Sequence, residues 1–369
     1  EIEGLNKLLE LSGLTPPSWE NSGSPANPDF GVRREWIENA VKQWHSEYDW
    51  RAWEAKFNSI PQYTIDVRDN DSHTYAVHFM CLFSTNPSAI PVIFPHGWPG
   101  SVFEFLPLLL HLREKYATPD ALPYNIVVPH LIGFGFSSPP PLDKDFTWID
   151  NARILSKLMH LLGFGATGYV AQGGDLGSAI ASYIAAGDPA CRMVHLNMPC
   201  MDPPEGVDVV ADIANGVYRD AEVRSLRAAK EITTRGLAYA ALQDTKPATA
   251  GYVVGSNPVS LLAWVAEKML AWSDPQLPVP LDKILTNSSQ WCYRRSLSEG
   301  VRTSEWLATV RAPIGYTWFE GEAPMSPKKW LDRLGMAKWY STNAKGGHFA
   351  ALEQPEDFWG HVTAFINEF

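Results

Sequence analysis

An aspartate occupies the point of the chain best suited to nucleophilic chemistry. Asp175 lies in GGDLGS (173–178), a G-x-D-x-G pattern that follows the apolar stretch TGYVAQ (167–172) and precedes the small-residue run SAIASYIAA (178–186). These compositions predict a strand, a sharp turn and a helix. A side chain at such a turn stands beyond the end of the strand, where it can attack a substrate.

The identity of this residue limits the substrates that the site could attack. A carboxylate is ionised at neutral pH and needs no base to activate it. Attack on an ester or amide would give a mixed anhydride, whereas attack on a saturated carbon that bears a leaving group gives an alkyl ester that water can open. The pattern therefore favours an epoxide or an alkyl halide. The alternative is that Asp175 only caps the following helix, because Asp is a favoured N-cap residue.

A second motif could supply hydrogen-bond donors to a reacting oxygen. HGWPGS (96–101) follows a predicted strand and precedes a predicted helix. In α/β-hydrolases the loop at this place supplies one oxyanion-hole N–H, and the residue after the nucleophile supplies the other. The expected donors are the backbone amides of Trp98 and Leu176, and His96 and Pro99 are expected to line the pocket. The alternative is an ordinary Gly/Pro turn.

A histidine near the C-terminal end is the expected general base. His348, in GGHFAALEQP, follows the last predicted strand, which fits the order nucleophile, acid, histidine along the chain. Glu322, in WFEGEAP, ends the preceding strand and could orient that histidine. Glu320 is its competitor, because side chains two residues apart share a face if the strand continues. Trp318 and Phe349 are expected to line the pocket.

The elements that must position these residues alternate between strand and helix. Strands are expected at residues 62–67, 75–83, 91–97, 124–132, 167–172, 313–319 and 338–343, and helices at 4–11, 34–57, 101–116, 150–164, 178–186 and 355–369. This order predicts a parallel sheet in an α/β fold. We expect an N-terminal extension with the first strands (1–88), a core (89–199 and 305–369) and a helical lid (200–304).

Composition excludes several classes of partner. The 369 residues carry a formal net charge of −11, with 45% hydrophobic and 19% charged residues, which fits a globular enzyme and excludes a disordered chain. No basic stripe is present, so nucleic acid and anionic membrane surfaces are not expected partners. The four cysteines (81, 191, 200 and 292) show no CxxC spacing, and no metal or cofactor is expected.

The hydrophobic pattern predicts a soluble, cytoplasmic protein. No apolar run is long enough to cross a bilayer, and no signal-peptide core is present. The chain begins at Glu1 rather than Met, so a removed N-terminal anchor or leader stays open as an alternative. The expected partners are a small-molecule epoxide and water, and a homodimer is the assembly considered.

Taken together, the motifs resemble those of the epoxide hydrolases of the α/β-hydrolase superfamily, in the microsomal-type branch that includes soluble fungal members. The resemblance extends over nearly the whole chain from about Phe30 and rests on FGVRREWIENAVKQWHSEYDWRAWEAKFNSIPQY (30–63), VHFMCLFS (77–84), HGWPGS, PHLIGFGFSSPP (129–140), GGDLGS and GGHFAALEQPE (346–356). It implies an α/β-hydrolase fold with a mostly parallel central sheet, a helical lid insertion and a long N-terminal extension that wraps the core. It also implies opening of an epoxide to a vicinal diol.

The resemblance assigns roles residue by residue. The family's nucleophile falls on Asp175, its general base on His348 and its acid on Glu322. Family members hold two lid tyrosines over the epoxide oxygen. These tyrosines fall on Tyr239, in RGLAYAALQDTKP, and on Tyr293, in WCYRRSLSEG.

The resemblance also bears on other positions, some of which depart from the family pattern. Tyr218 and Tyr252 are alternative lid tyrosines, which we expect to be packing residues. The aromatic-Pro peptide after HG is often cis in the family, and a cis bond is expected at Trp98–Pro99. The family commonly has Trp after the nucleophile, where this chain has Leu176, so the pocket wall should be less aromatic there. FEGEAP is also looser than the family's usual acid loop.

Two rival functions come from the same motifs. A haloalkane dehalogenase also uses an Asp nucleophile, but it needs N–H donors for halide, commonly from a Trp beside the nucleophile, and Leu176 cannot serve. A catalytically silent hydrolase-fold protein that binds a ligand is the other alternative, although every catalytic position is filled. A serine-type esterase is favoured even less than a dehalogenase, because Asp175 replaces its nucleophile.

Overall fold

One mostly parallel sheet organises the computed structural model of the chain, which describes residues 2–23, 30–199, 201–288, 307–323 and 325–369. In these residues eight strands follow the order β1-β2-β4-β3-β5-β6-β7-β8. The strands are β1 (Gln62–Arg68), β2 (Thr74–Leu82), β3 (Ile90–Ile93), β4 (Tyr124–Pro129), β5 (Tyr169–Gly173), β6 (Cys191–Leu196), β7 (Ile314–Phe319) and β8 (Ala337–Asn343). Only β1 with β2 and β2 with β4 pair antiparallel, which confirms the predicted α/β class.

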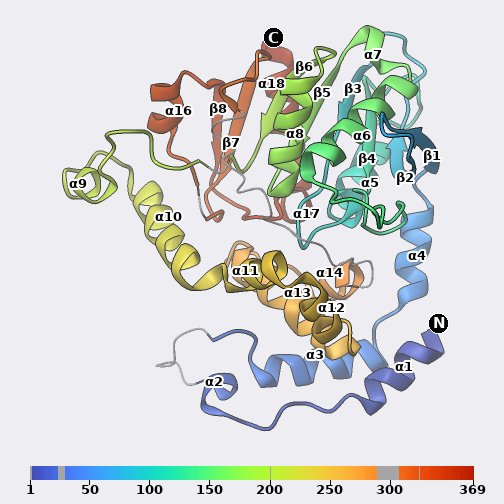
Figure 1. Cartoon of the computed structure of the whole chain (residues 1–369), viewed down its shortest axis with the longest axis vertical. Coiled ribbons are helices and arrows are strands. Elements are labelled where there is room, and N and C mark those ends of the chain that lie inside the picture. The colour runs from blue at the N-terminus through green and yellow to red at the C-terminus, as the bar shows by residue number, and fades with distance from the viewer. Residues whose placement is uncertain (1, 24–29, 200, 289–306, 324) are drawn as a thin grey trace.

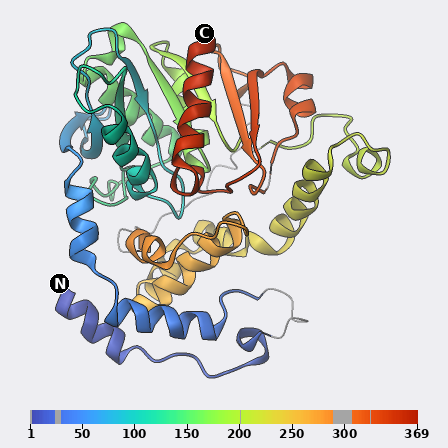
Figure 2. The same ribbon diagram turned by 180° about the vertical axis from the view of Figure 1, so that it is seen from behind.

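Helices cover both faces of this sheet. In Figure 1, α6 (Trp148–Leu161) and α8 (Leu176–Gly187) lie in front of it, and Figure 2 shows α5 (Leu106–Lys115) and α18 (Pro355–Glu368) on the opposite face. Shorter elements of the same part are η1 (Val102–Phe105), α7 (Phe164–Thr167), α16 (Lys328–Leu334) and α17 (Ala350–Glu353). The central strands are therefore buried on both sides, as parallel strands require.

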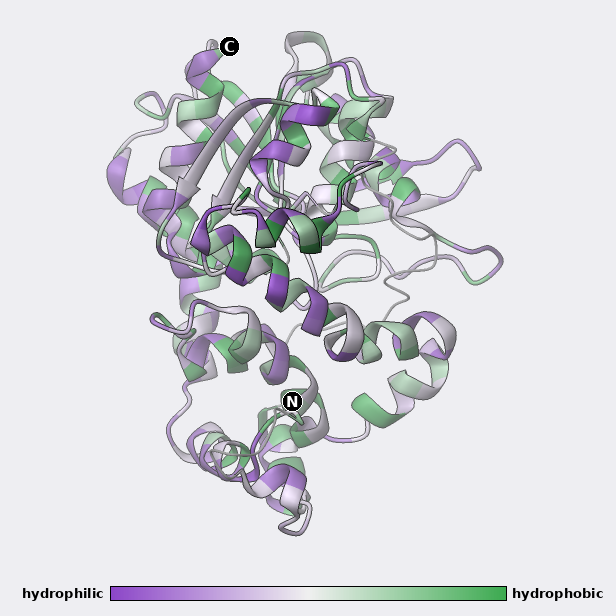
Figure 3. Ribbon diagram, turned by 90° about the vertical axis from the view of Figure 1, so that its left-hand side faces the viewer, coloured by the Kyte–Doolittle hydropathy of each residue, from purple (hydrophilic) through white to green (hydrophobic). Residues whose placement is uncertain are grey.

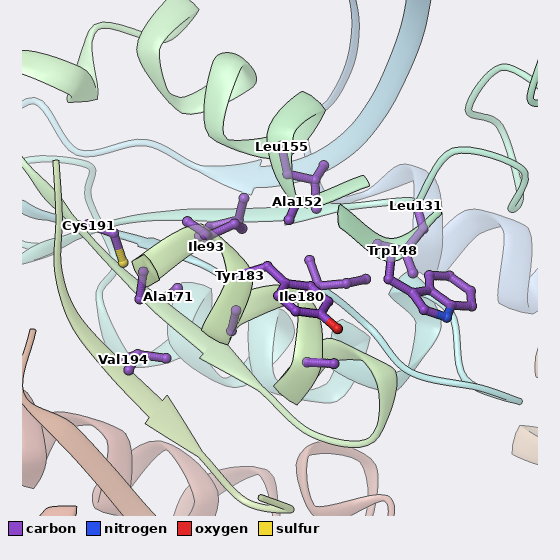
Figure 4. Packing of buried hydrophobic residues seen from close by; sticks show 14 of the residues in the cluster. Ile93, Leu131, Trp148, Ala152, Leu155, Ala171, Ile180, Tyr183, Cys191 and Val194 are labelled. Atoms are coloured by element: carbon purple, nitrogen blue, oxygen red, sulfur yellow. The ribbon is translucent and has the colours of Figure 1, made fainter. Parts of the chain in front are cut away.

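The core beneath α8 explains why small residues recur along this helix. Ile93, Ala171 and Val194 of the sheet pack against Ile180 of α8 and Leu155 of α6 (Figure 4). Small side chains on a helix allow close approach to the strands. This packing places the N-terminal end of α8 at the end of β5.

A helical insertion joins β6 to the C-terminal strands. Its described elements are α9 (Val209–Ala214), α10 (Asp220–Glu231), η2 (Ile232–Gly236, a π-helical turn), α11 (Ala238–Thr245), α12 (Pro247–Val254), α13 (Pro258–Trp272) and α14 (Leu281–Ser288). Hydrophobic and hydrophilic residues alternate along α10, which lies on the side that faces the viewer in Figure 3. A helix that buries one side against the protein has this pattern.

The N-terminal helices pack mainly on the insertion. They are α1 (Ile2–Leu11), α2 (Trp19–Ser22), α3 (Arg34–Ser46) and α4 (Trp50–Asn58). Leu9, Ile37 and Trp44 share one hydrophobic cluster with Leu262 and Met269 of α13. In Figure 1, α1 and α3 lie below the insertion on the side away from the sheet, and α4 leads up to the core. None of the described helices is long and apolar enough to cross a membrane.

The structure corrects three element predictions. The helix expected over residues 34–57 is two helices, because Asp49 caps α4 by accepting a hydrogen bond from the Ala52 N–H at 3.1 Å. The sequence reading missed β6, whose Arg192 and His195 interrupt its apolar run. The strand expected over 91–97 ends as β3 at Ile93, although the Phe94 N–H still donates to Val127.

Candidate active site

The turn at Asp175 has a backbone conformation that non-glycine residues rarely adopt. Asp175 has φ 51° and ψ −130°, between the end of β5 and the start of α8. A Cβ on Gly173 would lie 2.0 Å from the Gly177 carbonyl oxygen, and one on Gly177 would lie 2.2 Å from the Pro95 carbonyl oxygen. The two glycines of G-x-D-x-G are therefore required by close backbone contacts on both sides of the turn.

The Asp175 carboxylate faces the HGWPGS loop. Its Oδ1 accepts a hydrogen bond of 2.6 Å from the Trp98 N–H. Asp175 is the N-cap residue of α8, but among the described residues its side chain makes no capping hydrogen bond to that helix. Leu176 is the first residue of α8, so its N–H belongs to the helix N-terminal groups that have no intrahelical acceptor. This geometry suits a nucleophile beside an oxyanion hole better than a helix cap.

His348 lies between two carboxylates. Its Nδ1 is 3.0 and 3.1 Å from the Glu322 oxygens, and its Nε2 is 3.6 Å from Asp175 Oδ2. His348 is 8% exposed and Glu322 is 2% exposed. Burial opposes the charged imidazolium, but Glu322 and then Asp175 raise the pKa of His348 to about 9. Burial also raises the pKa of Glu322, and the His348 imidazolium opposes that rise.

Glu320 and Glu322 both lie beyond the end of β7. The strand stops at Phe319, and the Glu322 N–H donates to the Phe319 carbonyl in a turn. The two glutamates therefore do not share a strand face, and Glu320 lies 3.7 Å from Arg219. Trp318 is fully buried, and its indole N–H donates to the Glu322 carbonyl at 3.3 Å. Trp318 thus supports the acid loop and does not line an open pocket.

The HGWPGS loop is fixed from both ends. The Trp98–Pro99 peptide is cis, as expected. His96 is fully buried; its Nδ1–H donates to the Gly97 carbonyl at 2.9 Å, and its Nε2 accepts from the Leu131 N–H at 3.2 Å. Burial lowers the pKa of His96 to about 4, so the ring is neutral. The predicted pocket residue His96 therefore braces the loop through backbone contacts.

Helix α14 of the insertion holds the other end of that loop. The Asn287 side-chain amide donates to the Pro99 carbonyl, and its oxygen accepts from the Ser101 hydroxyl at 3.1 Å. Pro99 is buried, and the hydrogen bond that its carbonyl oxygen accepts from Asn287 helps to hold the loop in place. Phe349 is 2% exposed and contacts the His348 ring edge to face at 4.9 Å. Pro99 and Phe349, which the sequence predicts to line the pocket, therefore lie next to the site, where Pro99 supports the HGWPGS loop and Phe349 packs on His348.

Tyr239 is the described lid tyrosine that reaches this site. Its ring stacks on Trp98 with centroids 4.7 Å apart and planes 14° apart. Trp272 lies 5.7 Å from the Tyr239 ring and 4.9 Å from the His348 ring. The Lys268 ammonium lies 4.6 Å from the Tyr239 ring centroid. Aromatic contacts thus connect Tyr239 to the HGWPGS loop through Trp98 and to His348 through Trp272.

The other tyrosines considered lie elsewhere. Tyr293 is outside the described residues. Tyr218 accepts a hydrogen bond from the Trp330 indole N–H at 3.0 Å and donates to Asp212 at 3.2 Å. Tyr252 is 85% exposed. The described alternatives therefore have packing or surface positions.

Sequence reasoning missed two half-buried acids beside the site, Glu104 and Glu353. Burial raises the pKa of Glu104 to about 8, and this carboxyl lines a small cavity with Gly100, Asn287 and Phe349. Glu353 accepts hydrogen bonds from backbone groups around His348. The sequence signal that could have found them is an acidic residue inside an apolar segment. A carboxyl group that leaves water needs either a hydrogen-bonding partner or a proton.

Comparisons with known proteins identify the family. Residues 1–105 match the family described as epoxide hydrolase N terminus, and residues 90–242 match the alpha/beta hydrolase fold. A Dothistroma septosporum protein, named provisionally as an epoxide hydrolase, is 36% identical over 375 residues, which cover 100% of this chain and 87% of that protein. The chain belongs to the epoxide hydrolase family.

Solved structures and mammalian relatives of this epoxide hydrolase agree with that assignment. The structure of Aspergillus niger epoxide hydrolase matches with a TM-score of 0.89 and 38% identity, covering 100% of this chain and 93% of that one. Epoxide hydrolase 1 of Sus scrofa is 29% identical over 96% of this chain and 84% of that protein. The juvenile hormone epoxide hydrolase structure from Bombyx mori, at 24% identity and a TM-score of 0.81, shows the same fold.

Proposed function

We propose that this epoxide hydrolase forms a covalent ester on Asp175 and then hydrolyses that ester to release a vicinal diol. The arrangement around Asp175 is the observation that carries the proposal. One carboxylate oxygen is held by the Trp98 N–H, and the other faces His348 Nε2 at 3.6 Å. A nucleophile, a base and an oxyanion donor therefore lie within reach of one reacting carbon.

In the first step, an Asp175 oxygen attacks an epoxide carbon as the bond from that carbon to the epoxide oxygen breaks. The oxygen leaves as an alkoxide, which takes a proton from Tyr239 or Tyr293. The stacking of Tyr239 on Trp98 supports this role, because it holds the phenol beside the loop that contacts Asp175. A phenol has an unperturbed pKa of about 10 and is matched to a developing alkoxide.

In the second step, His348 removes a proton from water, and the resulting hydroxide attacks the ester carbonyl on Asp175. The oxyanion accepts hydrogen bonds from the backbone N–H groups of Trp98 and Leu176. When the tetrahedral intermediate collapses, the diol alkoxide leaves with the proton of the hydroxyl that water added, which restores the Asp175 carboxylate. The proton that His348 loses on ester formation returns the tyrosinate to a phenol, and the proton taken from water leaves His348 as the imidazolium of the free enzyme. Glu322 keeps Nδ1 protonated, which leaves Nε2 as the basic nitrogen.

Ester formation itself prepares His348 for this second role. In the free enzyme the Asp175 and Glu322 charges raise the pKa of His348 to about 9, which favours the imidazolium. The ester removes the charge of Asp175, so the pKa of His348 falls and a larger fraction of the ring is neutral. The histidine is thus more available as a base after the nucleophile has reacted.

The insertion α9–α14 acts as the lid of this site, and its contacts favour an apolar epoxide. Trp98, Tyr239 and Trp272 contact one another beside Asp175, and aromatic rings bind apolar substrate surface. Substrates of this kind suit detoxification or secondary metabolism. A cytoplasmic location and a homodimeric state belong to the same proposal, and light scattering on the purified full chain would test the second.

Diol formation over a panel of epoxides tests the proposed function. The panel contains styrene oxide, an aryl glycidyl ether, a fatty-acid epoxide and a disubstituted internal epoxide, with alkyl halides as controls. We expect diol from apolar epoxides, loss of turnover in Asp175→Ala and normal turnover in Asp120→Ala, a change at an exposed loop residue. Turnover of halides alone would indicate a dehalogenase, and tight epoxide binding without turnover would indicate a silent binder.

A further inference from the structure

Glu353 contacts the histidine loop through both of its carboxylate oxygens. Oε2 accepts hydrogen bonds from the Gly347 N–H at 3.0 Å and from the Asp274 N–H at 2.8 Å, and Oε1 accepts from the Phe349 N–H at 2.9 Å. Gly347 and Phe349 are the residues on either side of His348. One carboxylate therefore fixes the backbone on both sides of the expected base.

The same contacts attach the histidine loop to the end of α13. The His348 N–H donates to the Trp272 carbonyl at 3.0 Å, and the Gly346 N–H donates to Asp274 Oδ2 at 2.9 Å. A Cβ on Gly347 would lie 2.7 Å from the Trp272 carbonyl oxygen and from the Asp274 nitrogen. The two segments are thus in direct backbone contact, and the Glu353 carboxylate accepts hydrogen bonds from both of them.

We propose that Glu353 is a positioning residue that sets the orientation of His348 and couples it to the lid through residues 272–274. The inference rests on the proposed role of His348 as the base of ester hydrolysis. Trp272 makes the coupling specific, because its ring contacts both His348 and Tyr239. The group that donates a proton in the first step and the group that removes one in the second are therefore held by the same short segment.

A carboxylate is suited to this position because it offers only acceptors. Burial raises the pKa of Glu353, and the three backbone N–H groups oppose that rise by favouring the ionised form. A glutamine of the same shape keeps one acceptor oxygen but presents an NH2 group toward at least one N–H. An alanine leaves all three donors without this acceptor.

The test separates the two chemical steps in Glu353→Gln and Glu353→Ala. Stopped-flow fluorescence and rapid quench with mass spectrometry measure ester formation and ester hydrolysis in single turnovers. We expect formation to change by less than about threefold and hydrolysis to slow by on the order of tenfold to a hundredfold, more in Ala than in Gln, because a small misplacement of a catalytic group has an effect of this size. Glu356→Gln is the matched control, since Glu356 has a 75% exposed side chain and lies in the next helix.

Equal hydrolysis rates in wild type and in both variants would overturn the inference. If Glu353→Ala does not fold, Glu353→Gln alone decides the question. Hydrogen exchange at the Gly347 and Phe349 amides gives a readout independent of the reaction, and we expect faster exchange in the variants than in Glu356→Gln. If the wild type forms no ester, the proposed function fails, while the exchange measurement still reports whether Glu353 holds the loop.

Discussion

His348 Nε2 lies 3.6 Å from Asp175 Oδ2, while the Nδ1 of the same ring lies 3.0 Å from Glu322. In the proposed mechanism the imidazole therefore has one carboxylate that stays charged through the reaction and one that loses its charge when it becomes an ester. The pKa of this ring is raised to about 9 in the free enzyme, and ester formation as we propose it would lower that pKa and make the ring a better base.

Replacing His348 should separate the two half-reactions. In His348→Gln the nucleophile and the lid tyrosine remain, so epoxide should still alkylate Asp175. Without the base, hydrolysis should slow by about a hundredfold to ten-thousandfold. Intact-protein mass spectrometry should then find the chain heavier by one substrate mass, which peptide mapping assigns to Asp175. An unmodified chain that still consumes epoxide would contradict the two-step account.

The two neighbouring glutamates should differ sharply in effect. Glu322→Gln removes the charge that raises the pKa of His348, so the acidic limb of the kcat–pH profile, which follows deprotonation of this base, should move to lower pH, and kcat should fall at least about tenfold. Glu320→Gln changes a group near Arg219 and should leave the profile unchanged. Equal effects of the two substitutions would remove the basis for assigning Glu322.

Tyr239→Phe should slow ester formation and leave ester hydrolysis nearly unchanged, because the phenol acts only on the epoxide oxygen. The stacking on Trp98 should persist, since the ring itself is retained. We expect a decrease of about tenfold or more in the alkylation rate of single-turnover experiments. Tyr252→Phe, at an 85% exposed position, is the matched control and should react normally.

Glu104 should make stability depend on pH in a direction opposite to that of an ordinary ion-paired carboxylate. Burial raises its pKa to about 8 in the folded protein, compared with 4.5 for an ordinary glutamate. Its contribution to stability is therefore fully present below about pH 4.5 and is lost as the pH rises toward 8, by at most about 1.4 kcal/mol per pH unit.

Urea unfolding of Glu104→Gln and wild type between pH 5 and 8 measures this contribution. The free energy of unfolding of the variant, relative to wild type, should rise with pH across that interval. Glu114→Gln, an exposed change on α5, should give a constant difference. A constant difference for Glu104→Gln as well would show that its carboxyl titrates normally.

Local sequence patterns were sufficient to predict the turn at Asp175 and the mostly parallel sheet. The glycines around Asp175 could be recognised because close backbone contacts at Gly173 and Gly177 exclude any other residue. The histidine loop was found from its place after the last strand. Both features depend on residues near one another in the chain, which a sequence displays directly.

Contacts between distant segments could not be predicted in this way. The stacking of Tyr239 on Trp98 joins residues 141 positions apart in the printed numbering, and only the fold brings them together. The contacts of Glu353 could not be predicted from the sequence, because its three donors come from two separate loops. The choice between Glu322 and Glu320 depended on where β7 ends, and strand ends are poorly marked in sequence.

Single-turnover reaction in heavy-oxygen water tests the covalent route most directly. Excess enzyme is mixed with one epoxide, and the Asp175 peptide and the diol are analysed after quenching. Water attacks the ester carbonyl in our account, so the heavy oxygen should appear in the Asp175 carboxylate, and the diol should carry an oxygen that came from Asp175. Heavy oxygen found only in the diol would mean that water attacks the epoxide directly, and the ester on Asp175 would have to be abandoned.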